Sequence, residues 1–206
     1  MATLGFTPVD FEVFRIEGFD ERMQQIYAHV RPKLIRLGDE LAPVITRRLQ
    51  MEFFPHVAKH ARRTVNPPPE TWAAFGPSPK GYTRFGFLAL YVSRAGIHAR
   101  AVVKAEADHR PEIGRLLKAH GAQLAQAFDG VAISRYDRWD FRQMPEAVAA
   151  DADFFSALGQ RLEMKGGGID VGFGWKAAEA LRLDREEVAD AFRELEPLYR
   201  VLRTVV

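Results

Sequence analysis

The stretch from Phe85 to Lys104, FGFLALYVSRAGIHARAVVK, decides the fold that the sequence predicts. Its first part, Phe85 to Val92, is apolar on both faces, which is typical of a strand in the centre of a sheet. Ser93 to Gly96 supplies a hairpin connection, and Ile97 to Lys104 then alternates between apolar and mostly polar residues. We therefore predict two antiparallel strands, the first of which is buried on both faces.

The second strand of this hairpin carries different side chains on its two faces. One face is apolar and carries Ile97, Ala99, Ala101 and Val103. The other face carries His98, Arg100 and Lys104, interrupted only by Val102. Because side chains alternate along a strand, this pattern predicts one face toward a core and one polar face.

Helical periodicity dominates the chain before the hairpin. Thr7 to Asp10 has the pattern of a helix start, with a hydroxyl cap, a proline and an acid at the third position. Apolar residues recur at helical spacing from Phe19 to Leu37, and Pro32 predicts a kink or a break inside that run. Gly38-Asp39 predicts a further break, followed by another helix that ends near Leu49.

Strands and helices alternate after the hairpin. Helical patterns follow Asp108 and open at Pro145, and strand patterns begin at Val131 and Ile169. A capping pair, Asp184 and Glu187, opens the closing helix.

The order of these segments predicts a single α+β domain over residues 1–206. A helical N-terminal part (1–52) precedes a strand-rich part (70–105), which starts with a short strand from Thr71 to Phe75. Alternating strands and helices follow (106–206). We expect a mostly antiparallel sheet of about five strands, covered by helices on one face.

Composition excludes several classes of protein. The chain has 206 residues, of which 47% are hydrophobic and 27% are charged, enough for a full core. It contains no cysteine, so disulfides, thiolate zinc sites and cysteine nucleophiles are excluded. No apolar run approaches the roughly 20 residues of a membrane span, and the N-terminus lacks a signal-peptide pattern. We therefore expect a cytoplasmic protein with no membrane partner.

Charge is distributed unevenly along the chain. Between Phe53 and Ala105 there is one acid, Glu70, against eight bases, a net charge of +7; the bases are Lys59, Arg62, Arg63, Lys80, Arg84, Arg94, Arg100 and Lys104. The remainder holds 21 bases and 26 acids, a net charge of −5. A segregated basic block indicates an anionic partner, or a solvated face balanced by neighbouring acidic helices.

A basic motif, FFPHVAKHARRTVNPPPETW, runs from Phe53 to Trp72. If Pro55 starts a helix, its cations Lys59, Arg62 and Arg63 cluster on one side, where arginine forks suit phosphate or carboxylate groups. Asn66, the only asparagine of the chain, precedes three prolines that form a stiff lead into Trp72. Alternatively the motif is a structural clasp, in which Arg62 or Arg63 pairs with Glu52 or Glu70 and Trp72 belongs to the core.

Other chemistries find less support. On such a helix His56 and His60 would share a face, the spacing of paired metal ligands. The residue after the first histidine is Val57 rather than the glutamate of a zinc peptidase, and a third ligand would have to come from a distant residue such as His98. Since two ligands alone rarely make a site, we expect no bound metal. We also expect no other cofactor. None of the four serines lies in Gly-x-Ser-x-Gly, and Gly166-Gly167-Gly168 lacks the Gly-Lys-Thr ending of a phosphate loop.

The basic motif from Phe54 to Pro68, with Thr71-Trp72, resembles the YktB-like family of uncharacterised bacterial proteins. Three further segments fit the same family: Phe6 to Phe11, Val30 to Leu34, and Lys80 to Tyr82. The resemblance extends over the whole chain and is densest from Phe6 to Tyr82. It implies a single cytoplasmic α+β domain, and it implies no particular activity, substrate or cofactor.

We therefore hypothesise a non-enzymatic binding module for an anionic ligand, either nucleic acid or a phosphate-bearing small molecule. Charge would come from Lys59, Arg62, Arg63, Lys80 and Arg84, and Trp72 or Tyr82 would offer a stacking surface. His56, His60, Thr64 and Asn66 complete the candidate site.

Two alternatives remain open. One is a small enzyme acting on a phosphorylated or carboxylated metabolite, with His56 or His60 transferring a proton. The other is a structural or interaction protein without a ligand. The sequence leaves the oligomeric state undecided, with a monomer slightly favoured.

Overall fold

The hairpin forms as the sequence predicts. In the computed structural model, which describes residues 3–61, 63–137 and 139–203, β3 (Gly86–Ser93) pairs antiparallel with β4 (Gly96–Val103). The register runs from Gly86 opposite Val103 to Ser93 opposite Gly96. Every residue of both strands is buried, so the prediction of a central, doubly buried strand is confirmed.

The sheet has seven strands in the order β1-β2-β3-β4-β7-β5-β6, and every neighbouring pair is antiparallel. The remaining strands are β1 (Phe54–Val57), β2 (Glu70–Gly76), β5 (Ala132–Arg135), β6 (Ala147–Ala149) and β7 (Ile169–Lys176). The α+β class and the antiparallel pairing are confirmed, but the expected number of about five strands is too low. The sequence analysis missed β1 and β6, which have four and three residues and are too short to show a period.

The helices lie in two parts of the sequence, before β1 and after the hairpin of β3 and β4. The N-terminal ones are α1 (Pro8–Glu12), a 3-10 turn η1 (Val13–Arg15), α2 (Phe19–Gln25), a π-helical turn η2 (Ile26–Val30) and α3 (Arg31–Leu49). The later ones are α4 (Arg110–Ala119), α5 (Gly121–Ala127), α6 (Ala152–Glu163), α7 (Ala177–Ala180), α8 (Arg185–Glu194) and α9 (Glu196–Arg203). The predicted starts at Thr7 and Asp184 are confirmed, since both residues form capping boxes.

Two predicted helix boundaries are wrong. Gly38 does not end a helix, because α3 continues through it to Leu49 and the missing side chain lets Pro55 pack closely there. Pro145 does not open a helix; β6 follows it, and α6 starts after the Asp151 cap. Pro32 is accommodated in the first turn of α3, directly after the π-helical turn, so the predicted irregularity lies just before it.

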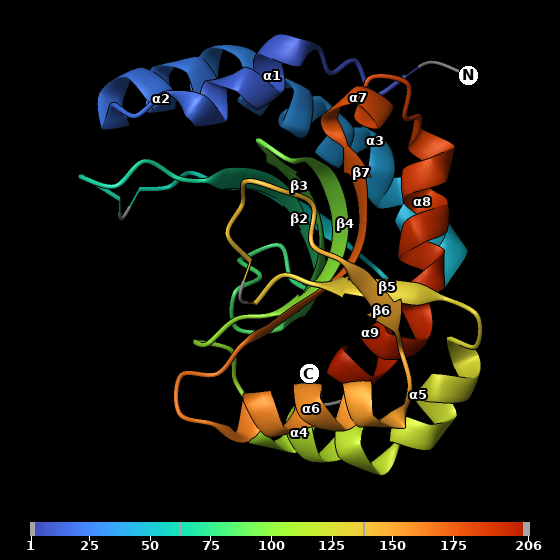
Figure 1. Ribbon diagram of the computed structural model, residues 1–206. Coiled ribbons are helices and arrows are strands. Elements are labelled where there is room, and N and C mark those ends of the chain that lie inside the picture. The colour runs from blue at the N-terminus through green and yellow to red at the C-terminus, as the bar shows by residue number, and fades with distance from the viewer. Residues whose placement is uncertain (1–2, 62, 138, 204–206) are drawn as a thin grey trace.

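The two faces of the sheet are covered differently. Helices α3, α8 and α9 pack on one face and form the main core with apolar side chains such as Phe75, Leu90 and Val171. Figure 1 shows β3 and β4 bending away from these helices, with loops on their concave side. That second face carries Trp72, Tyr91 and Arg100, which point away from the main core. Loops rather than helices therefore enclose the face on which the polar side chains lie.

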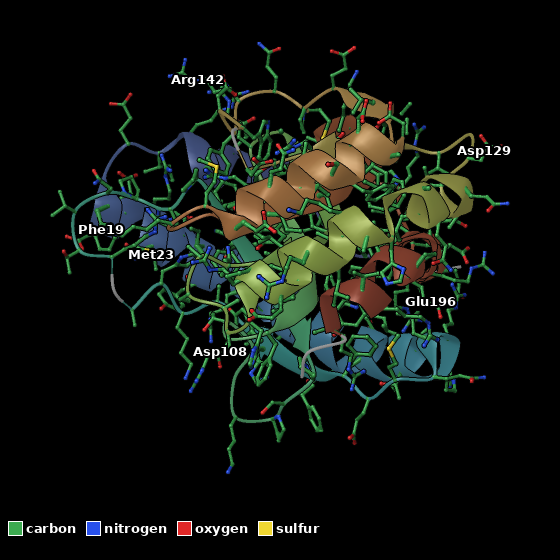
Figure 2. All side chains as sticks on the ribbon, turned by 90° about the horizontal axis from the view of Figure 1, so that it is seen from below. Phe19, Met23, Asp108, Asp129, Arg142 and Glu196 are labelled. Atoms are coloured by element: carbon green, nitrogen blue, oxygen red, sulfur yellow. The ribbon has the colours of Figure 1, made fainter. Side chains whose placement is uncertain are left out.

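Helices α4 and α6 cross at two glycines. They lie side by side in Figure 2, and a Cβ atom on Gly159 would lie 2.5 Å from the Gly114 carbonyl oxygen. A Cβ atom on Gly114 would lie 2.6 Å from the Gly159 carbonyl oxygen. The crossing therefore requires the absence of a side chain on both helices.

We predict that Gly159→Ala destabilises the protein by about 1–3 kcal/mol, because the added methyl group forces the two backbones apart. In a solvent-exposed helix, replacing glycine with alanine would instead stabilise the protein by up to about 1 kcal/mol. The sign of the change in unfolding free energy therefore decides between the two cases. Urea unfolding followed by circular dichroism measures it. Ser156→Ala on the same helix serves as the control and should change stability little; equal or greater stability of Gly159→Ala contradicts the prediction.

Candidate functional site

The basic motif forms an edge strand and a loop, not a helix. β1 pairs with the end of β2, Phe54 opposite Gly76 and Val57 opposite Ala73. Pro55 fits an edge strand because a margin residue need not donate a ladder hydrogen bond. The loop that follows turns at His60, whose φ of 51° is left-handed. The prediction that Pro55 starts a helix is wrong, and with it the shared helical face of His56 and His60.

Four rings of the predicted site nevertheless come together. The rings of His56 and Tyr82 lie 5.3 Å apart, and those of His60 and Trp72 lie 5.4 Å apart. Trp72 Nε1 donates a hydrogen bond of 2.9 Å to Tyr82 Oη, which joins the two pairs. Lys104 Nζ lies 5.0 Å from the centre of the Trp72 ring. We call His56, His60, Trp72, Tyr82 and Lys104 the edge cluster.

The two histidines of the edge cluster are held by hydrogen bonds. His56 Nε2 donates to the Ser78 carbonyl oxygen at 2.9 Å, because a carbonyl can only accept. His60 Nε2 lies 3.0 Å from Thr71 Oγ1. Burial, together with the positive charges of Arg63 and Arg31, lowers the pKa of His60 to about 4. His60 is therefore neutral at physiological pH.

A hollow of about 510 Å³ opens beside the edge cluster. Its walls carry charged and aromatic side chains from three parts of the chain, namely Arg31, Asp39, His56, Lys59 and Tyr82. The helical segment before and at the start of α3 holds the outer wall: Arg31 Nη1 donates to the Ala58 carbonyl oxygen at 2.5 Å, and Tyr27 Oη donates to the Lys59 carbonyl oxygen at 3.0 Å.

Other residues of the predicted site do not join this cluster. Arg84 is exposed and pairs with Asp108 at 2.7 Å. Lys80 is exposed in the turn between β2 and β3, and Arg63, Thr64 and Asn66 are exposed in the loop after His60. Arg62 lies outside the described residues.

A buried charge cluster lies next to the edge cluster, and the sequence analysis missed it. Arg100 is fully buried, and its guanidinium carbon lies 4.1 Å from the ring centre of Tyr91 and 3.9 Å from that of Tyr136. Its Nη2 lies 2.9 Å from Glu70 Oε2, and its Nη1 lies 3.1 Å from Asp170 Oδ2. We call Glu70, Tyr91, Arg100, Tyr136 and Asp170 the arginine cluster.

Burial and mutual charge set the protonation of this cluster. Burial raises the pKa of Glu70 and of Asp170, and Arg100 opposes that shift. Burial by itself would lower the pKa of Arg100, but the charges of Asp170 and Glu70 outweigh it, so Arg100 stays protonated. Burial also raises the pKa of Tyr91. Because Arg100 and Tyr91 are inaccessible to solvent, we interpret the cluster as structural rather than as an open site.

His98 extends the arginine cluster along β4. It is buried, its Nε2 lies 2.9 Å from Ser93 Oγ, and its Nδ1 lies 3.3 Å from Tyr136 Oη. Burial, with the charge of Arg100, holds the pKa of His98 well below its usual value. The predicted polar face of β4 is therefore real at His98 and Arg100, but it is enclosed.

Ion pairs with acidic residues reduce the number of unpaired cations in the basic block between Phe53 and Ala105. Arg84 and Arg100 are neutralised by acids, and Arg62 lies outside the described residues. Five cations of the block have no acid within 4.0 Å among the described residues: Lys59, Arg63, Lys80, Arg94 and Lys104. Within the same ranges no three histidine, aspartate or glutamate side chains gather as metal ligands.

Residues 6–199 match a family described as a domain of unknown function, DUF1054. The chain belongs to this family. A UPF0637 protein of Lysinibacillus sphaericus is 33% identical over 210 residues, which cover 98% of the DUF1054 chain and 97% of that protein. A UPF0637 protein of Bacillus velezensis is 31% identical over 210 residues, covering both chains completely. A third, of Staphylococcus haemolyticus, is 48% identical over 134 residues, 65% of this chain and 66% of that one.

These matches confirm the resemblance to the YktB-like family. The described part of this DUF1054 chain contains no helix that is both long and apolar enough to cross a bilayer.

For the arginine cluster of this DUF1054 protein, we predict that Arg100→Met destabilises folding by about 3–5 kcal/mol, because it leaves two carboxylates close together and buried without their cation. The triple variant Arg100→Met, Glu70→Gln, Asp170→Asn should recover part of that loss. Guanidinium unfolding gives both values.

The control is Arg84→Met, which breaks an exposed ion pair and should change stability by less than about 1 kcal/mol. Equal effects of Arg84→Met and Arg100→Met would contradict the role assigned to burial.

The lowered pKa of His60 predicts a pH dependence. The unfolded chain takes up a proton near pH 6.5, while folded His60 resists until about pH 4, so stability should fall as pH drops through this window. A shift of this size corresponds to roughly 3 kcal/mol in a fully buried group. Solvent around a partly buried ring reduces it to about 1–2 kcal/mol.

His60→Gln should therefore lose less stability than the wild type between pH 6.5 and 4, measured by urea unfolding at several pH values. His29→Gln removes an exposed histidine and serves as the control, with an unchanged pH profile. Parallel profiles for His60→Gln and the wild type would show that His60 is not the titrating group.

Proposed function

We propose that the protein binds an anionic ligand, with nucleic acid as the leading candidate, at the edge cluster and the hollow beside it. One observation carries this proposal: the partly exposed, hydrogen-bonded rings of Trp72 and Tyr82 lie beside two lysines, Lys59 on the wall of the hollow and Lys104 over the Trp72 ring. Lys104 also interacts with the charges of Glu70 and Asp170. Accessible rings beside cations suit a ligand that combines planar groups with phosphates.

The rings and the cations would have separate roles. Tyr82 and His56 border the hollow and would contact a base or another planar group, which every nucleotide offers. Lys59 and Arg31 line the same hollow and would contact phosphates, while Asp39 on its wall partly offsets their charge. Arg63, Thr64 and Asn66 on the exposed loop would extend the contact along a nucleic-acid strand, as would Lys80 in the turn between β2 and β3.

The enzyme alternative receives less support from the histidines. A pKa of about 4 makes His60 a weak base at neutral pH, where a general base should have a pKa near the working pH. His56 uses its Nε2 proton in the bond to Ser78, which leaves only Nδ1 for a substrate. The alternative of a structural protein without a ligand is supported by the Trp72–Tyr82 hydrogen bond, which holds the two rings together. The binding experiment below distinguishes this alternative from ligand binding.

We predict that the protein binds fluorescein-labelled twelve-nucleotide single strands of DNA and RNA, and that affinity falls steeply between 50 and 200 mM salt. Lys59→Ala should weaken binding and reduce the magnitude of the salt slope by roughly 0.7–1 unit, since each phosphate contact releases counterions. Fluorescence anisotropy at several salt concentrations measures both, and the melting temperature should stay unchanged.

Lys165→Ala is the matched control, because it removes an exposed lysine from the turn before β7. It should leave affinity and slope as in the wild type. Absence of wild-type binding at 50 mM salt would reject nucleic acid as the ligand, and equal effects of the two lysine variants would reject the location of the site.

A further inference from the structure

A second hollow, of about 780 Å³, lies next to β5. In the order of the sheet β5 is near one margin, and β1 of the basic motif forms the opposite margin. One wall is a face of α6, formed by Ala157, Gln160 and Arg161, with Met164 directly after the helix. The opposite wall is the segment after β5, with Trp139, Gln143 and Met144 among its side chains. A volume of this size suits a small organic ligand.

Arg161 is the feature of this hollow that calls for a partner. No acid of the described residues lies within 4.0 Å of its guanidinium. Its Nε atom is buried out of reach of solvent, so the terminal nitrogens Nη1 and Nη2 are the groups that a ligand in the hollow can contact. Arginine that lines a cavity with its fork free is suited to bidentate binding of an oxyanion.

The two acids on the walls are already engaged. Asp137 accepts two hydrogen bonds from Arg135, at 3.0 Å to Nε and 2.9 Å to Nη2. Asp140 Oδ1 accepts from the Arg142 backbone amide at 2.9 Å. Arg161 is therefore the free cation of this hollow, while the two carboxylates disfavour a dianion such as phosphate more than a singly charged carboxylate.

The remaining lining residues favour an apolar body for the ligand. Trp139 and the methionines Met144 and Met164 offer ring and thioether surfaces. Gln143 and Gln160 add amide groups that donate and accept. The wall thus combines one oxyanion fork with an apolar surface.

We propose that this hollow binds a small monocarboxylate with an aromatic or aliphatic body, whose carboxylate pairs with the Arg161 guanidinium. The body lies against Trp139 and the two methionines. Trp139 also lies 4.8 Å from the His98 ring and 5.1 Å from the Arg100 guanidinium carbon, so an occupied hollow contacts the wall of the arginine cluster. This site is independent of the basic motif and of the function proposed above.

The test uses 3-phenylpropionate as the probe and the full chain. Nitrogen–proton NMR spectra observe the indole Nε1–H signals, and Trp139→Phe assigns the one from Trp139. We expect that signal to shift on titration, with a Kd in the millimolar range. Arg161→Gln should weaken binding by roughly ten-fold or more, because a charge-assisted bidentate contact is lost. Arg161→Lys, which keeps the charge without the fork, should give an intermediate loss.

Matched controls separate the site from general charge. Arg47→Gln removes an exposed arginine on α3, which does not line the hollow, and should leave binding unchanged. Phenethylamine, a cation of similar body, should not shift the Trp139 signal, and inorganic phosphate should bind more weakly than 3-phenylpropionate. Unfolding curves confirm that each variant is folded.

Three results would overturn the proposal. The first is no shift with 3-phenylpropionate up to its solubility limit. The second is an equal Kd for the wild type and both Arg161 variants. The third is equal binding of phenethylamine, which would leave an apolar hollow without an anion site.

Discussion

A charge can be buried in a protein only where opposite charges and hydrogen bonds replace its water, and Arg100 imposes this constraint on the whole second face of the sheet. Glu70 at the start of β2 and Asp170 in β7 must both reach one guanidinium on β4. The rings of Tyr91 and Tyr136 must also lie against it. The central strands bend toward the loops on this face (Figure 1), and Arg100 and Tyr91 beneath are fully buried.

The edge cluster depends on the same arrangement. Trp72 stacks on Tyr91 with ring centres 5.1 Å apart, and Lys104 lies over both rings, so the exposed aromatic surface rests directly on the buried one. A rigid base of this kind limits the rotamers available to Trp72 and Tyr82. Rings held in place lose little side-chain entropy on contact with a ligand, which favours binding by preorganised surfaces.

The sequence predicted the features that local patterns determine. The apolar run of β3, the alternation of β4 and the caps at Thr7 and Asp184 are encoded within a few residues, and the structure has all of them. Pro55 was misread because proline suits both a first helical turn and an edge strand, and only the pairing with β2 decides between them. The arginine cluster joins residues 70, 100 and 170, a long-range pairing that no local period encodes. Two clues were present: Glu70 is the sole acid of the basic block, and Asp170 interrupts an apolar strand.

The two margins of the sheet have a consequence for self-association. A free strand edge can template the addition of a strand from another molecule, which is the first step of fibrous polymerisation. Here β1 presents Pro55, which has no amide proton to donate, and the opposite margin, β6, is three residues long. Each margin therefore offers few consecutive hydrogen-bonding groups to a recruited strand. An open seven-stranded sheet can in this way avoid the addition of strands from other molecules without closing into a barrel.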